Sequence, residues 1–332
     1  MGTISEKWAR EKITLTEHVL ITGGLGHIGS ELIRRLAENR SVRAITILDN
    51  LLTQRYASLF DLPKEVDYTF VEGDVLATDD VARAMRGVDA VVHLAAITNA
   101  EGSFDISEQV QSVNYDGTRN VVQVCAQQGV RPLLFPSTTS VYGPVSGIAR
   151  EDCDRSELRP QSPYATSKLA AEDEILAATE RGEISGVVLR LGTIFGPSPG
   201  MRFHTAVNKF IFSAATGRPL TVWSDAVELV RPYLALEDGV AAIEFMLDRP
   251  EAAGQVYNVV TLNATLDQVI DAVRSNVPGV EIEYTNTRLL NQVSYHVDDS
   301  KIRELGFSYR GNLAAGVRAT FELFSGVMQN NR

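Results

Sequence analysis

Residues 19–30 constrain this chain most, because an apolar run there breaks into closely spaced glycines and then resumes with helical spacing. Such a pattern predicts a buried strand, a tight turn and a helix. Gly23 suits an unusual backbone angle, Gly26 leaves the backbone open to a ligand, and Gly29 lets the helix pack closely on a sheet. The N–H groups and the positive dipole end of this helix would face an anion such as a phosphate.

An acidic residue at a defined distance strengthens this prediction. The next apolar run, 44–48, ends in Asp49, which follows Gly29 by about 20 residues. A dinucleotide-binding fold places at this point the carboxylate that binds ribose hydroxyls. A GxxGxxG spacing alone is a weak signal, but the spacing, the strand and the acid together predict a dinucleotide site.

Apolar and helical stretches alternate along the first part of the chain. Leu32, Ile33 and Leu36 recur at helical spacing and form one apolar stripe. The alternation predicts a doubly wound α/β fold with a parallel sheet. Further strands are expected at 68–71, 89–96, 131–135, 186–191 and 253–260.

A length of 332 residues suggests two domains, or one large domain with an appendage. The regular alternation weakens beyond about residue 192. We expect a short N-terminal extension at 1–16, a dinucleotide-binding domain at 17–192 and 231–262, and a smaller substrate-binding domain at 193–230 and 263–325.

The composition, 44% hydrophobic and 22% charged, is that of a soluble globular protein. Its formal net charge of −11 argues against a general nucleic-acid or anionic-membrane binder, so an anionic ligand must meet local arginines. Cys125 and Cys153 lack metal-ligand spacing, so no metal site is expected and a reducing, cytoplasmic setting is the simplest interpretation. Neither a signal peptide nor a membrane-spanning run is recognised.

Ligands on doubly wound sheets bind at the carboxyl ends of the strands. At the end of the 89–96 run, Leu94, Ala95 and Ala96 would let a flat cofactor lie against the sheet, and His93 is expected to be structural. Asp74 would either cap the following helix or accept a hydrogen bond from an adenine amine, and the cap is the simpler reading.

Tyr164 and Lys168 lie four residues apart at the start of a predicted helix, where Pro163 suits the first turn. This spacing places both side chains on one helix face. A phenol with a pKa near 10 is a poor base at neutral pH, and a neighbouring ammonium would lower that pKa. Such a pair can take a proton from a carbinol while hydride leaves for a nicotinamide.

Taken in chain order, the glycine motif, Asp49, the Ser137–Thr138 strand end and Tyr164-x-x-x-Lys168 resemble the extended short-chain dehydrogenase/reductases, in particular the NAD-dependent nucleotide-sugar epimerase/dehydratase branch. The resemblance covers roughly residues 17–325. It implies NAD as cofactor, a nucleotide-diphosphate sugar as substrate, and a homodimer formed by the helix after Asn114 and the helix that carries Tyr164.

The resemblance also implies residue roles. Tyr164 would be the base, Lys168 would bind the nicotinamide ribose and tune Tyr164, and Thr138 would hydrogen-bond the reacting sugar oxygen. The expected cofactor residues are Gly23, Gly26, His27, Ile28, Gly29, Asp49, Asn50, Asp74, Val75, Leu94, Ala95, Ala96, Asn114, Ser137, Tyr164 and Lys168. The expected substrate residues are Thr138, Thr139, Thr193, Arg202, Asn208 and Arg231.

Departures from the family pattern concern the substrate. Thr193 stands where relatives often carry an asparagine, and 290–292 stands about where a basic residue usually meets phosphate. Arg231 matches the family's pyrophosphate arginine, and Arg202 and Arg288 could complete a local positive pocket.

The reaction type is inferred from Thr139 and Ser140, where dehydrating relatives carry Asp-Glu and decarboxylating relatives carry a glutamate at the second position. Neither side chain is a carboxylic acid, so C4 epimerisation through a transient ketone is the leading hypothesis. A net ketoreductase or dehydrogenase remains an alternative. The 135–138 segment also resembles short-chain threonine dehydrogenases, and a non-catalytic dinucleotide-binding regulator is the alternative of another class.

Overall fold

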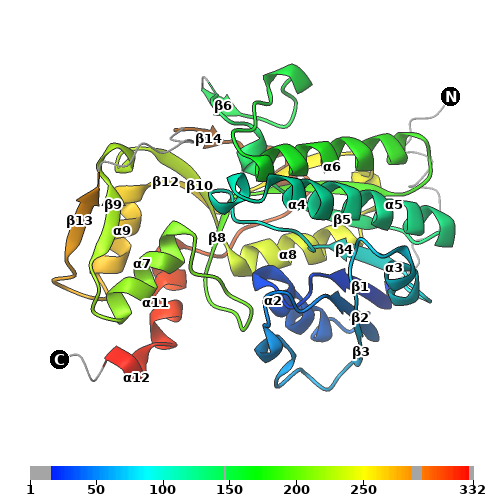
Figure 1. Cartoon of the computed structure of the whole chain (residues 1–332), viewed down its shortest axis with the longest axis horizontal. Coiled ribbons are helices and arrows are strands. Elements are labelled where there is room, and N and C mark those ends of the chain that lie inside the picture. Colours follow the sequence, from blue (N-terminus) through cyan, green and yellow to red (C-terminus); the bar gives the residue numbers. More distant parts are fainter. Residues whose placement is uncertain (1–15, 146, 286–293, 329–332) are drawn as a thin grey trace.

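The computed structural model describes residues 16–145, 147–285 and 294–328. Within these residues the chain forms a large α/β part and a smaller part beside it, on the right and left of Figure 1. Three segments named in the sequence analysis lie outside the described residues: 290–292, where relatives carry a phosphate-binding basic residue, Arg288, and residues 1–15 of the predicted extension.

A seven-stranded sheet forms the centre of the large part, in the order β11-β7-β5-β4-β1-β2-β3 over the described residues. All of its neighbouring strands pair in parallel. Its strands are β1 (His18–Thr22), β2 (Ala44–Asp49), β3 (Asp67–Glu72), β4 (Ala90–His93), β5 (Leu133–Thr138), β7 (Gly186–Leu191) and β11 (Val256–Val259). The doubly wound parallel sheet predicted from the sequence is therefore confirmed.

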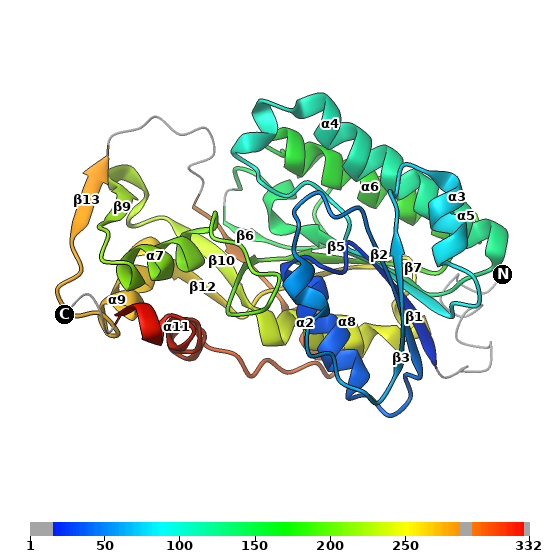
Figure 2. The same ribbon diagram turned by 60° about the horizontal axis from the view of Figure 1, so that its bottom comes forward.

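Helices cover both faces of this sheet, as Figure 2 shows. The predicted stripe of Leu32, Ile33 and Leu36 is fully buried, in a cluster shared with Ile243 and Met246 of the neighbouring helix. On one face lie α2 (His27–Ala37) and α8 (Leu236–Leu247); on the other lie α3 (Thr78–Ala84), α4 (Ser107–Gln111), α5 (Gly117–Gln128) and α6 (Pro163–Glu180), with a π-helical turn at Ser112–Asp116.

The smaller part is built on two short sheets. β10 (Val230–Ala235) pairs in parallel with β8 (Thr193–Phe195) and antiparallel with β12 (Leu262–Thr265). β9 (Leu220–Trp223) pairs with β13 (Ile282–Thr285). Around these sheets lie α7 (Ala206–Ala215), α9 (Leu266–Arg274), α11 (Leu313–Glu322) and α12 (Ser325–Met328).

The remaining elements are short. β6 (Ile148–Ala149) pairs with β14 (His296–Val297) beside the junction of the two parts. Helix α10 (Ser300–Glu304) follows, and Ile302 and Phe307 pack into the core of the large part rather than into the smaller one. Short 3₁₀ turns lie at Tyr56–Leu59, Gly102–Phe104, Thr139–Val141, Arg155–Glu157, Ser224–Ala226 and Pro250–Ala252.

The predicted division into domains differs from this arrangement at two places. β10 lies within the range 231–262 assigned to the large domain, but it pairs with β8 and β12. The return of Ile302 and Phe307 to the large core lies within the range assigned to the smaller domain. No helix among the described residues is long and apolar enough to span a bilayer.

Candidate active site

A cavity of about 450 Å³ opens at the carboxyl ends of β1, β2, β4, β5 and β7, between the two parts of the molecule. It is the edge at which doubly wound sheets bind ligands. Most of the predicted site residues line it: Gly23, Gly26, His27, Ile28, Gly29, Asp49, Asn50, Val75, Leu94, Ala95, Ala96, Ser137, Thr138, Tyr164, Lys168, Thr193 and Arg202.

The glycine turn has the geometry that its sequence predicts. Gly23 adopts φ +65°, and a Cβ there would lie 2.6 Å from the backbone of Ala95. A Cβ at Gly29 would lie 2.6 Å from the carbonyl oxygen of Gly24. Gly26 caps α2 without a side-chain hydrogen bond, so the N-terminal amides of the helix are directed to a ligand at the cavity. These residues fit a dinucleotide pyrophosphate.

A segment of the smaller part covers the far side of this turn. The ring of His27 is buried and its Nε2 lies 2.8 Å from the carbonyl oxygen of Gly196. Burial lowers the pKa of His27 to about 4, so the neutral imidazole donates this hydrogen bond. Gly200 donates its N–H to Ser30 Oγ at 3.0 Å. His27 therefore fastens the two parts together beside the cavity.

Asp49 lies at the end of β2 with its carboxylate fixed by the backbone. Its Oδ2 accepts from Leu25 N at 3.1 Å and its Oδ1 accepts from Leu51 N at 3.0 Å. Both bonds hold the carboxylate at the rim of the cavity, where the sequence predicts an acid for ribose hydroxyls.

The helix-cap reading of Asp74 is wrong. Helix α3 begins later, at Thr78, and its N-cap is Ala77. Asp74 instead accepts from Leu76 N at 3.0 Å, which closes a turn, and from Asn50 Nδ2 at 3.0 Å. The side chain thus joins the ends of β2 and β3.

His93 is structural, as expected. It is fully buried at the end of β4, with Nδ1 2.7 Å from Thr22 Oγ1 and Nε2 3.0 Å from Thr118 Oγ1. Burial, with a smaller contribution from the charge of Lys168, lowers its pKa to about 3. The predicted strand 89–96 ends at this residue, and Leu94, Ala95 and Ala96 leave the sheet to line the cavity.

Asn114 holds the loop after β4 in place through hydrogen bonds to the backbone of Ile97. Its Oδ1 accepts from Ile97 N at 2.7 Å, and its Nδ2 donates to Ile97 O at 2.9 Å and to Ser167 Oγ at 3.0 Å. It therefore connects the cavity wall to helix α6, in keeping with the structural role expected for it near the cofactor.

Tyr164 and Lys168 lie on the cavity side of α6, which begins at Pro163 with Ser162 as its N-cap. Burial raises the pKa of Tyr164, while Arg202 and a hydrogen bond with Thr138 lower it in part. Arg202, which the sequence assigns to the substrate, is thus a cation that acts on the phenol. The tuning of Tyr164 by Lys168 stays a prediction. Lys168 Nζ lies 3.8 Å from the centroid of the Phe135 ring.

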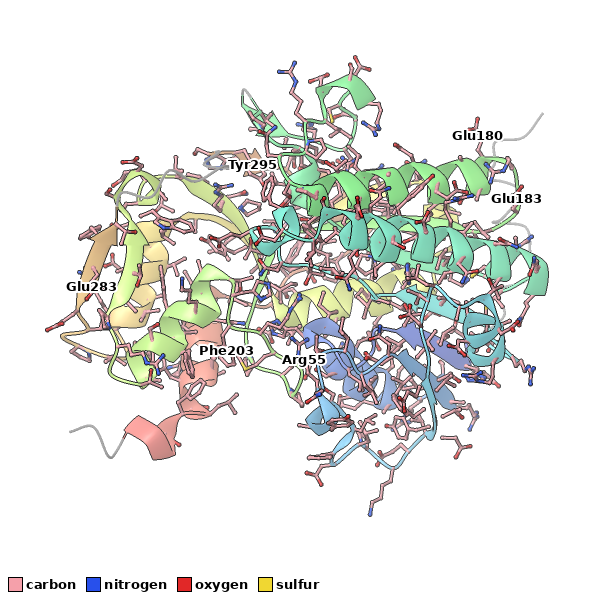
Figure 3. The ribbon with its side chains drawn as sticks, in the orientation of Figure 1. Arg55, Glu180, Glu183, Phe203, Glu283 and Tyr295 are labelled. Atoms are coloured by element: carbon pink, nitrogen blue, oxygen red, sulfur yellow. The ribbon has the colours of Figure 1, made fainter. Side chains whose placement is uncertain are left out.

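The end of β5 presents Ser137 and Thr138 to the cavity. Thr138 Oγ1 also accepts from Ser140 N at 3.1 Å, which fixes the side chain at the start of the next turn. Thr139, expected at the substrate, is buried and turned away, with its hydroxyl 3.5 Å from the hydroxyl of Tyr295. Tyr295 covers it from the junction with the smaller part (Figure 3).

Two arginines, Arg55 and Arg202, line the cavity together with His204. Arg202 donates to Thr98 Oγ1, and burial together with the charge of Arg55 lowers its pKa to about 10. His204 lies beside both arginines, and burial lowers its pKa to about 4. Figure 3 shows Arg55 at the boundary between the two parts, facing the segment that carries Phe203. An acidic protein thus offers a local cationic wall.

Five predicted residues lie outside the cavity lining in the described part of the chain: Asp74, Asn114, Thr139, Asn208 and Arg231. The amide of Asn208 is fully buried and donates to the carbonyl oxygen of Arg202 at 3.0 Å. It therefore shapes the segment that carries Arg202. Arg231 lies on β10, with its guanidinium 5.9 Å from the centroid of the Tyr295 ring.

Sequence reasoning missed a buried ion pair directly behind the site. Glu172 of α6 and Arg190 of β7 approach to 2.7 Å, and Ser137 Oγ donates to the same carboxylate. Glu172 follows Lys168 by one helical turn, a spacing that could have indicated it. Arg55 and His204 were also missed.

The fold and the site together are those of a dinucleotide-dependent oxidoreductase. Comparison with known proteins identifies the family. The model of the NAD dependent epimerase/dehydratase family matches residues 19–260. The chain therefore belongs to the NAD-dependent epimerase/dehydratase family. The family confirms the resemblance drawn from the sequence and makes NAD the cofactor.

Three similar proteins illustrate the range of the family. A trifunctional UDP-glucose 4,6-dehydratase/UDP-4-keto-6-deoxy-D-glucose 3,5-epimerase/UDP-4-keto-L-rhamnose-reductase of Arabidopsis thaliana is 30% identical over 93% of this chain and 47% of its own length. The chain thus spans about half the length of that relative. A dTDP-glucose 4,6-dehydratase of Streptomyces griseus is 30% identical, with 92% of this chain and 93% of its own length covered. The solved UDP-glucose 4-epimerase of Thermus thermophilus, in complex with NAD, is 28% identical with a TM-score of 0.79, covering 93% and 99% of the two chains.

Proposed function

We propose that the protein is an NAD-dependent nucleotide-sugar epimerase that inverts C4 of the sugar through a transient 4-keto intermediate. The observation that carries the proposal is the end of β5. It offers Thr138 and Ser140 to the cavity beside Tyr164, with hydroxyls and no carboxylate. One base, one hydroxyl donor and a hydride carrier are sufficient for this reaction.

The cofactor would be held by residues whose geometry fits it. The glycine turn and the first amides of α2 would bind the pyrophosphate, Asp49 would bind ribose hydroxyls, and Ser137 and Lys168 would lie at the nicotinamide end. When bound, NAD supplies the acceptor and then the donor of a hydride.

The chain's own residues handle the proton. Tyr164, as the phenolate, takes the proton of the C4 hydroxyl, and Thr138 donates a hydrogen bond that positions the same oxygen. The charges of Arg202 and Lys168 would stabilise the phenolate in this enclosed site. After the ketone turns over within the cavity, the hydride would return to the other face of C4 and Tyr164 would return the proton to the C4 oxygen, which inverts C4.

The nucleotide diphosphate would be bound by the cationic wall and its surroundings. Arg202 lines the cavity, and Arg231 lies outside the lining, next to Tyr295. Thr193 would contact the sugar in place of an amide. The family relatives named above act on UDP- and dTDP-sugars, which supports this substrate class.

A 4,6-dehydratase needs further acid and base groups for the C5 proton and the C6 hydroxyl. Among the described residues, the carboxylates that line the cavity are Asp49 and Glu101. Asp49 is held at the glycine turn, and Glu101 is exposed on the loop before the Gly102–Phe104 turn. Neither lies at the end of β5, which favours epimerisation over dehydration.

The test is incubation of the purified enzyme with UDP- and dTDP-hexoses in heavy water, with products identified by NMR while nicotinamide absorbance is followed. We expect a C4 epimer, no net absorbance change and no carbon-bound deuterium. Glu101→Gln should turn over at the wild-type rate. Deuterium at C3 or C5, or a 4-keto-6-deoxy product, would contradict the proposal. Stoichiometric absorbance change would indicate a dehydrogenase or reductase, and no turnover a regulator.

We also propose a cytoplasmic location for this enzyme. Cys125 and Cys153 are both unpaired thiols, which suits a reducing compartment.

A further inference from the structure

Glu172 and Arg190 form a buried ion pair between α6 and β7. Their side chains are 1% and 5% exposed. Arg190 donates from Nη2 to Oε2 of Glu172 at 2.7 Å and from Nε at 3.1 Å. The guanidinium lies 4.8 Å from the centroid of the Tyr142 ring, and the Tyr142 hydroxyl donates to Asn258 Oδ1 at 2.8 Å. The carboxylate is thus held from behind by a rigid chain of contacts.

The same carboxylate also contacts the active site. Ser137 Oγ donates a hydrogen bond to Glu172 Oε1, and Ser137 lines the cavity. Lys168 precedes Glu172 by one turn on the same face of α6, so its ammonium lies within the field of the carboxylate. One buried anion therefore acts on two residues of the cavity wall.

The other groups around Lys168 provide no negative charge at neutral pH. From β5 the ring of Phe135 faces its Nζ, and from β4 His93 is neutral because burial holds its pKa near 3. On α6, burial raises the pKa of Tyr164, which favours its neutral phenol. Arg190 of β7 carries a positive charge beyond Glu172.

We propose that Glu172 is a positioning residue of this active site: a buried counter-charge that keeps the Lys168 ammonium protonated and fixes the Ser137 hydroxyl beside it. The inference rests on the proposed function in giving Lys168 and Ser137 their roles at the nicotinamide end. It does not depend on which sugar is the substrate.

The direction of the effect follows from the charges. Burial lowers the pKa of Lys168 to about 7, and the carboxylate of Glu172 raises it. Removing that negative charge therefore lowers the pKa further, so the ammonium loses its proton at a lower pH. A helix-packing role for Glu172 would alter stability and leave this titration where it is.

The direct test is a titration of Lys168 in the full-length protein, by NMR of lysine labelled with ¹³C at Cε, with Lys168→Met to assign the resonance. Glu172→Gln keeps an amide oxygen for Ser137 and removes the charge. We expect the pKa of Lys168 measured in this variant to be lower than in the wild type by about one pH unit or more. Glu174→Gln is the matched control, because Glu174 lies on the same helix and pairs with Arg181 at 3.6 Å near the surface.

A second variant separates charge from folding. Glu172→Gln leaves Arg190 buried without its anion, which destabilises the protein, whereas Glu172→Gln with Arg190→Gln removes both buried charges. We expect the double variant to regain thermal stability and still to titrate Lys168 at a lower pH than the wild type. If the double variant regains thermal stability and Lys168 again titrates at the wild-type pH, the proposal is overturned.

Kinetics supply the readout for catalysis. In Glu172→Gln and in the double variant, the alkaline limb of the kcat profile should move to lower pH, and Glu172→Asp should restore it in part. If Lys168 titrates at the wild-type pH in both Gln variants, the role of Glu172 is refuted. If the wild type turns over no sugar but Lys168 titrates at a lower pH in the Gln variants, only the proposed function is refuted.

Discussion

At the scale of single residues, the surroundings of Tyr164 have opposing effects on the pKa of its phenol. Burial favours the neutral phenol, while Arg202 and the hydrogen bond with Thr138 favour the phenolate. A base that must take up and return a proton within one enclosed complex needs such groups, because Arg202 and Thr138 offset part of the cost of burying the phenolate. The contacts of Tyr164 thus determine how readily the sugar oxygen is deprotonated.

Replacing Tyr164 by phenylalanine tests this placement. Tyr164→Phe keeps the ring and its packing but removes the ionisable oxygen, so we expect kcat to fall by roughly two to four orders of magnitude. The Kd for NAD and the melting temperature should change little. Turnover assays, isothermal titration calorimetry and thermal unfolding measure these three quantities. A rate near that of the wild type would show that another group acts as the base.

Asp49 leads to a prediction about cofactor choice. Its carboxylate is fixed by the N–H groups of Leu25 and Leu51, so it cannot turn away from an added 2′-phosphate. The repulsion should weaken NADP binding relative to NAD by about 1–4 kcal/mol. Fluorescence titration measures both dissociation constants. Asp49→Asn should narrow the difference, and equal affinities in the wild type would contradict the assignment.

The residues found from the sequence are those whose chemistry is unusual for their setting. Gly23 and Gly29 lie where a Cβ would collide with backbone, and the Tyr164–Lys168 spacing stands out at a helix start. Glu172 was missed because a mid-helix glutamate is typical of a solvated face, and its partner Arg190 lies on another element. Asp74 was misread because a cap and a turn use the same side-chain oxygen in the same way.

At the scale of elements, long apolar strands were predictable and short pairings were not. β2 and β7 have the bounds that their apolar runs indicate, because strands covered on both faces are apolar throughout. The two-residue strands β6 and β14 are too short to carry any periodicity. β10 could not be assigned to its sheet from sequence, since its partners β8 and β12 lie far from it along the chain.

Helix α6 serves the active site with one face and leaves the opposite face open. Its outward stripe consists of Thr166, Ala170, Asp173, Ala177 and Glu180, all half-buried or exposed. Ala170 and Ala177 are one heptad apart, and such small side chains allow another helix to approach closely. Helix α5 lies beside α6 on the same side of the sheet (Figure 2).

We therefore expect a homodimer in which α5 and α6 of each protomer form a four-helix bundle. Ala177→Glu places a bulky charge on this surface and should give a monomer at micromolar concentration, measured by light scattering. Ser275→Glu, at the exposed end of α9 in the smaller part, is the control and should remain dimeric. A monomeric wild-type protein would contradict the expected assembly.

At the scale of the whole molecule, the glycine turn is shared between the two parts. Gly200 packs so closely that a Cβ there would lie 2.4 Å from the carbonyl oxygen of Gly26. Ser198 Oγ donates to the carbonyl oxygen of His27 at 2.9 Å, and His27 in turn donates to Gly196. A ligand that orders the turn therefore acts on the smaller part through direct contacts.

This arrangement predicts that NAD stabilises both parts together. A ligand that binds only the folded state lowers the population of locally opened forms, and here opening the turn requires the 196–200 segment to separate from it. Hydrogen exchange followed by mass spectrometry should therefore show slower exchange on NAD addition at 23–29 and at 196–202 alike. Strand β13, at the far end of the smaller part, should be unaffected. Protection confined to 23–29 would show that the 196–202 segment moves independently of the glycine turn. The smaller part would then respond to the sugar nucleotide and not to NAD.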